Sequence, residues 1–247
     1  MKRIIFNALF LVILTSNCFS QKQTKDTICL SDTLTIMPFR SMKLSKDSAS
    51  SYKAIKCETT TNVGMRFEVG ISKYYYNDKT QEWLGNHGGP NFNLILTLNK
   101  LNFGLRFKPW TVNPKTELSF DNIILPRYAS LNPVKIDYYA GYSIDLNHKI
   151  SIEPYLGFSK TIFYVINEVE LQQTYSIPKA NGLISGATFN KYFKINNSEY
   201  IALFTNIGYS FVDYKKTNQN LGIGYFEWTI GIAYKGFFKK QFLKKIE

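Results

Sequence analysis

The chain has 247 residues, enough for one large domain or two small ones. Aromatic residues make up 16% of the chain, and the formal net charge is +12 at pH 7. No recognition helix, zinc-ligand spacing or base-stacking motif accompanies this positive charge, which argues against a nucleic-acid partner.

The N-terminus reads "MKRIIFNALFLVILTSNCFSQ", two basic residues followed by an apolar run over residues 4–14. The run is too short for a membrane-spanning helix, and small or short residues follow it. This order predicts a secretory signal peptide over residues 1–20, cleaved after Ser20. Lipidation of Cys18 is the alternative, although "LTSNC" lacks the small residue expected before such a cysteine.

Residues 21–61 are polar, rich in Ser, Thr and Lys, and weakly patterned. We interpret them as an N-terminal periplasmic extension with one short strand over residues 33–37. Cys29 and Cys57 both lie in this segment, and an exported protein permits a disulfide between them. No CxxC or Cys/His cluster supports a metal site, and we expect no cofactor.

From residue 62 to residue 238, apolar and polar residues alternate almost throughout, which is the signal for β-strands. In "NFNLILTLNKLNFGLRF", residues 91–107, the apolar residues mirror one another about Asn99-Lys100, as in a hairpin. Eight strands are predicted, over 63–74, 91–98, 101–109, 135–146, 150–166, 182–194, 200–211 and 224–238.

The connections between these strands alternate in length. Short turns are expected at 99–100, 147–149 and 196–197, and longer loops elsewhere. An up-and-down meander with this alternation places all long loops at one end. Residues 239–247, "KKQFLKKIE", follow the last strand as a basic C-terminal tail.

Each strand has an apolar face and a polar face, and two closed barrels fit that pattern. A soluble eight-stranded ligand carrier turns its apolar face inward, whereas a membrane barrel turns it toward lipid. Glycines and full charges share the polar face, and the strands have the roughly 9 to 11 residues that cross a bilayer. We therefore predict an all-β, eight-stranded, antiparallel transmembrane barrel whose lumen is plugged by side chains. Its lumen charge network is predicted to be Arg66, Glu68, Arg106, Asp145, Glu153 and Glu227.

Aromatic residues concentrate near the predicted strand ends, where amphipathic rings are stable at a membrane interface. This distribution predicts two aromatic girdles. Near the long loops they comprise Tyr74, Tyr75, Phe107, Trp110, Phe163, Tyr164, Phe211, Tyr214 and Phe226, and near the short turns Tyr200, Tyr234, Phe237 and Phe238.

The leader ending "CFSQ", the eight alternating segments and the aromatic last strand "FEWTIGIAYKGFF" resemble small outer-membrane β-barrels of the OmpA/OmpX type, in the variety common in Bacteroidota. The resemblance implies a monomer in outer-membrane lipid of a Gram-negative bacterium, folded by the barrel-assembly machinery. It also implies periplasmic termini, short periplasmic turns and long extracellular loops. Such chains often end on the last strand, and the tail here is a departure.

The expected role is structural, adhesive or surface-interacting, with an extracellular partner bound through the long loops. The alternatives are the soluble carrier and an outer-membrane enzyme acting on lipid at the rim. The enzyme would use His87, with Asp78, Glu82 and Asp121 as candidate partners, because a general base needs a group within hydrogen-bond reach. His148 falls in a predicted turn, and no catalytic residue is assigned.

Overall fold

A computed structural model describes residues 27–36, 52–76, 80–81, 87–110, 118–120, 123–125, 130–147, 149–166, 179–216 and 221–245. The predicted signal peptide, His148, Asp78, Glu82 and Asp121 lie outside these residues. The chain forms two compact units, one over Thr60–Lys239 and one from Met1–Thr59 with Lys240–Glu247.

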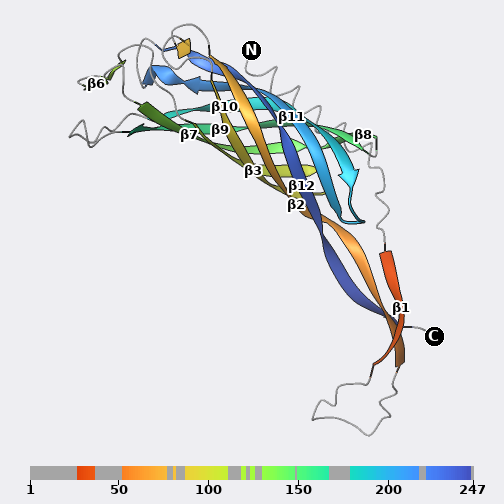
Figure 1. Cartoon of the computed structure of the whole chain (residues 1–247). Coiled ribbons are helices and arrows are strands. Elements are labelled where there is room, and N and C mark those ends of the chain that lie inside the picture. Colours follow the sequence, from red (N-terminus) through yellow and green to blue (C-terminus); the bar gives the residue numbers. More distant parts are fainter. Residues whose placement is uncertain are drawn as a thin grey trace, which may run out of the picture. The chain divides into compact units, whose positions relative to one another are not determined.

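The larger unit is a closed, antiparallel β-barrel (Figure 1). Each strand pairs with its neighbours in the chain, and the first strand also pairs with the last, so the ladder has no open edge. The strands are β2 (Tyr52–Tyr76), β3 (Gly88–Leu98), β4 (Leu101–Pro109), β7 (Ser130–Tyr142) continued by β8 (Ile144–Asn147), β9 (Ile150–Ile166), β10 (Ala180–Lys194), β11 (Glu199–Asp213) and β12 (Ile223–Lys245). The predicted all-β, eight-stranded barrel is confirmed.

The hairpin of β3 and β4 has the register that its mirrored sequence predicts. Leu98 lies opposite Leu101, and every second pair from there to Phe92 and Phe107 joins two large apolar residues. Asn99 has a φ of 58°, which an asparagine tolerates better than most side chains in a two-residue turn.

The fourth predicted strand is interrupted, and this changes the position of Asp145. β4 accompanies β7 only as far as the pair Leu101 and Tyr142, and β8 then pairs with β9 alone. Asp145 therefore lies beyond the turn of the neighbouring hairpin, with its side chain 51% exposed and 4.0 Å from the Nζ of Lys100. Its predicted place in the lumen charge network is wrong.

The smaller unit contains β1 (Thr27–Ile36), the first residues of β2 and the last of β12. β1 pairs antiparallel with β2, and Cys29, directly opposite Cys57, forms a disulfide with it. β1 is longer than the strand that was predicted over residues 33–37. The predicted tail also differs, because β12 continues as a strand to Lys245.

The remaining described elements are small. β5 (Leu118–Phe120) and β6 (Ile123–Leu125) form a separate two-stranded ladder in a long loop, and η2 (Tyr214–Lys216) is a 3-10 turn after β11. Within the described ranges, no helix is both long and apolar enough to cross a membrane.

Candidate functional site

The outer wall of the barrel is apolar. Leucine, isoleucine, valine and aromatic side chains alternate outward along every strand, for example Leu94, Phe103 and Leu203, which are 45%, 46% and 51% exposed. On a water-soluble protein such a continuous apolar surface would be far larger than usual. We call this surface the apolar belt, and its two ends the long-loop end and the short-turn end.

The height of the apolar belt can be estimated on β10. Its outward residues between Asn181 and Lys191 are Leu183, Ser185, Ala187 and Phe189. Ten residues at about 3.3 Å each, tilted by about 40°, span about 25 Å, which is the height of the apolar band of outer-membrane barrels. The dimensions of the belt match a bilayer.

An ion-pair cluster lies in the lumen near the short-turn end. The Nε of Arg66 lies 2.9 Å from Glu68, and its Nη1 donates to Glu153 at 2.7 Å. Arg66 also donates to the Tyr192 hydroxyl at 2.9 Å, and Ser143 donates to Glu153 at 3.0 Å. Each charge in this cluster has an opposite charge beside it, as a side chain removed from water requires.

A second layer, in the middle of the lumen, is built around Arg106. Its guanidinium lies 4.8 Å from the ring centre of Tyr139 and 5.0 Å from that of Tyr155. Gly104 makes room for one ring, since a Cβ there would lie 2.1 Å from Tyr139. Arg106, predicted as a member of the lumen charge network, is held between two aromatic faces, a favourable cation–π arrangement.

A third layer, toward the long-loop end, is one that the sequence prediction largely missed. Lys108 contacts Asp137 at 2.9 Å and Glu227 at 2.6 Å, and Lys135 contacts the same two carboxylates at 3.6 and 3.3 Å. Only Glu227 was predicted here. Lys108 lies two residues after Arg106 on the same strand, so strict alternation would have predicted it for the network.

Four aromatic residues predicted for the girdles face the lumen instead. Tyr74, Trp110, Phe163 and Tyr214 are at most 5% exposed, because they continue the inward alternation of their strands. Tyr200 and Phe237 are half-buried. The outward, exposed members of the predicted girdles are Tyr75, Phe107, Tyr164, Phe211, Phe226, Tyr234 and Phe238.

His87, the candidate base, belongs to this inward aromatic cluster. Its ring centre lies 5.6 Å from that of Tyr74, 5.5 Å from that of Tyr76 and 5.6 Å from that of Trp110. Burial raises the pKa of the Tyr214 hydroxyl, which lies at the same end just beyond β11. These rings pack against one another at the long-loop end of the lumen.

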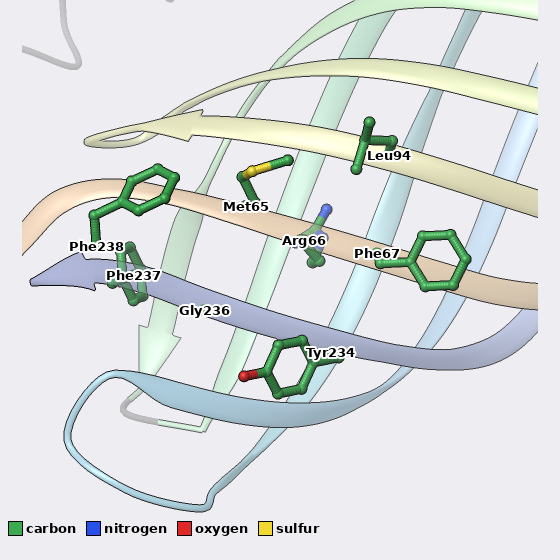
Figure 2. Close-up of a pocket in the computed structure, with 8 residues that line it drawn as sticks. All are labelled: Met65, Arg66, Phe67, Leu94, Tyr234, Gly236, Phe237 and Phe238. Carbon is green, nitrogen blue, oxygen red and sulfur yellow. The ribbon is translucent and has the colours of Figure 1, made fainter.

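Figure 2 shows the residues that line a pocket in the apolar belt, where β12 has no side chain at Gly236. Outward side chains of β2, β3 and β12 surround it, among them Met65, Phe67 and Leu94. Most of its lining is apolar, and Arg66 also lines it. In the part of the chain that the structure describes, no group of three His, Cys, Asp or Glu could hold a metal ion.

Comparison with known proteins finds structural similarity only. No protein-family model and no curated protein sequence matches the chain. Among solved structures it is similar to Ail, the attachment invasion locus protein of Yersinia pestis, in complex with the heparin analogue sucrose octasulfate (TM-score 0.45, 15% identity, 71% of this chain and 99% of that chain).

Two further structures are similar to the same extent. One is Ail in a second crystal structure (TM-score 0.43, 16% identity, 71% of this chain and 99% of that chain). The other is Neisserial surface protein A (TM-score 0.40, 11% identity, 72% of this chain and 99% of that chain). Similarity at these identities concerns the fold alone.

Proposed function

We propose that this chain is an integral outer-membrane β-barrel with a structural, adhesive or other surface-interaction role. The observation that carries the proposal is the reversed polarity of the barrel, with Leu94 and Phe103 on the outer wall and Arg66 and Arg106 inside. In hydrocarbon, backbone groups find no water, and a closed antiparallel ladder satisfies them all.

The polarity also counts against a soluble ligand carrier. A carrier for an apolar ligand would turn its leucine and phenylalanine side chains inward, around a cavity. Here the inward side chains include two ion pairs, Arg66 with Glu153 and Lys108 with Glu227. Layers of this kind support a lumen that is plugged.

We further propose the orientation that outer-membrane barrels of this size adopt, with short turns and termini in the periplasm and long loops outside. The disulfide between Cys29 and Cys57 supports an oxidising compartment for the N-terminal segment. An extracellular partner would then meet the long loops, and the protein would act as a monomer in outer-membrane lipid.

The test is extraction and heat-modifiable mobility of the full chain. The protein should leave membranes only with detergent, and its folded form should migrate differently from the boiled form on a denaturing gel. A chain that is soluble without detergent, with one mobility before and after boiling, would contradict the proposal.

A further inference from the structure

Three lysines lie at the long-loop end of the apolar belt, one on β9 and two just outside the ends of the neighbouring strands β10 and β11. Lys160 on β9 lies directly opposite Asn181 on β10. Lys179 precedes β10 by one residue, and Lys215 lies in η2, just after β11. Lys179 and Lys215 are exposed, and Lys160 is half-buried. Lys179 precedes Asn181 by two residues, which is the spacing at which side chains of an extended chain share a face.

Large apolar side chains adjoin these lysines within the belt. Leu183 lies opposite both Phe158 on β9 and Phe211 on β11, so the three occupy one row across three strands. They are 47%, 67% and 52% exposed. The row lies two residues from Lys160 and Asn181 along the strands, so a cationic surface directly borders an apolar one.

An acidic residue also faces this region and has to be counted. Asp213 ends β11, and its Oδ1 accepts the backbone N–H of Lys215 at 3.0 Å. Among the described residues of this region, three lysines against one carboxylate leave a net charge of plus two. Asp213 keeps its negative charge while it accepts this bond, so the lysines remain in excess over the carboxylate.

The combination selects a particular kind of partner. A free anion would use the lysines and leave the apolar row without a role, whereas an apolar ligand would use only the row. An amphiphile with an anionic headgroup uses both, and phosphate oxygens suit several ammonium donors at once.

We infer that Lys160, Lys179 and Lys215 form a binding surface for a phosphorylated membrane lipid, with its acyl chains over Phe158, Leu183 and Phe211. The inference rests on the proposed function, because only a membrane-inserted barrel brings lipid to this wall. It adds a preferred lipid class and a location to that function.

The experiment measures lipid preference at the barrel surface. The full chain is reconstituted in phosphatidylcholine vesicles with spin-labelled phosphatidic acid or spin-labelled phosphatidylcholine, and the motionally restricted fraction of each is compared. One lysine near a membrane surface contributes about fivefold to binding of an anionic lipid, so the preference for phosphatidic acid should be at least that large. The variant K160Q/K179Q/K215Q should lose the preference.

A charge-matched control replaces three exposed lysines at other places on the barrel rims, K73Q/K191Q/K194Q, and should keep the preference. Equal loss in both variants would mean general attraction to a basic protein and would overturn the inference. So would equal retention of a spin-labelled fatty acid, or full displacement of the lipid by glycerol 3-phosphate at matched ionic strength.

This design distinguishes failure of the proposed membrane function from failure of the proposed lipid-binding surface. If the chain does not insert into vesicles or shows no heat-modifiable mobility, the membrane function itself is contradicted. If every variant inserts and the unmodified chain still shows no preference for phosphatidic acid, only the lipid-binding surface is wrong.

Discussion

At the scale of single residues, the lumen contains charges in two different environments. Arg66 is 1% exposed and lies between two carboxylates, whereas Arg106, 2% exposed, lies between two tyrosine rings. In the first case opposite charges offset the cost of removing both groups from water. In the second, the π faces and a 3.5 Å contact to the Tyr155 hydroxyl surround the cation.

Replacing Glu153 with Gln should destabilise the barrel strongly. The change leaves the charge of Arg66 with only Glu68 beside it, and breaking a buried ion pair costs about 3–5 kcal/mol. Urea unfolding in vesicles, followed by gel mobility, measures the loss.

The matched control is Lys100→Gln, which breaks the exposed 4.0 Å pair with Asp145. An exposed pair contributes about 0–1 kcal/mol, so this variant should unfold almost as the parent does. Comparable losses in both variants would contradict an enclosed lumen.

Residue alternation was enough to place Arg66, Glu68, Glu153 and Glu227 inside, but it could not identify their partners. Arg66 meets Glu153 across 87 residues of sequence, and the meeting depends on the register of strands that are not adjacent. Too many aromatic residues were predicted for the girdles, for another reason. Nearness to a strand end decided those predictions, and Tyr74 and Tyr214 follow the inward alternation instead.

At the scale of the strands, tyrosine rings in the lumen occupy the space that glycines leave free. The Tyr155 hydroxyl would lie 2.6 and 2.4 Å from Cβ atoms built at Gly186 and Gly208, and Tyr139 occupies the space above Gly104. Two rings thus extend from β7 and β9 over glycines on β4, β10 and β11. The strand pattern predicted these glycines on the polar face, whereas the rings that fill their space required the three-dimensional arrangement.

Removing both rings should open a pore. Tyr139→Ala with Tyr155→Ala leaves Arg106 facing a water-filled gap, and planar bilayers should then show steps of conductance with a preference for anions. The parent chain should show none.

Tyr138→Ala provides the control, because Tyr138 neighbours Tyr139 but is 55% exposed on the outer wall. Conductance of equal size in the parent, or in this control, would mean that the tyrosine layer is not the seal. Heat-modifiable mobility of each variant shows first that it folds.

At the scale of the whole barrel, stability should depend on the depth of a residue in the apolar belt. Leu94→Arg places a charge near the middle of the belt and should cost about 2–4 kcal/mol of folding free energy in a bilayer. Tyr164→Arg, close to the long-loop end, should cost about 0–1 kcal/mol. Unfolding by urea in vesicles measures both.

The two positions are similarly exposed, 45% for Leu94 and 53% for Tyr164, so a barrel surrounded by water would tolerate both changes alike. Equal, small effects would therefore contradict burial of the belt in hydrocarbon. The number of strands and the polarity of the wall were predictable because both follow from a local two-residue period. The extent of β12, to Lys245, was not, because the pairing of β12 with β2 decides where it ends.

The pairing of β2 with β12 has a consequence for synthesis. β2 is the first strand of the barrel and β12 the last, so the ladder that joins them spans nearly the whole chain. Such long-range pairing forms slowly, and a ribosome that has made only seven strands leaves β2 without one of its two neighbours. The cylinder can close only after translation of the final strand, and a chain truncated before Ile223 would have two unsatisfied edges at once.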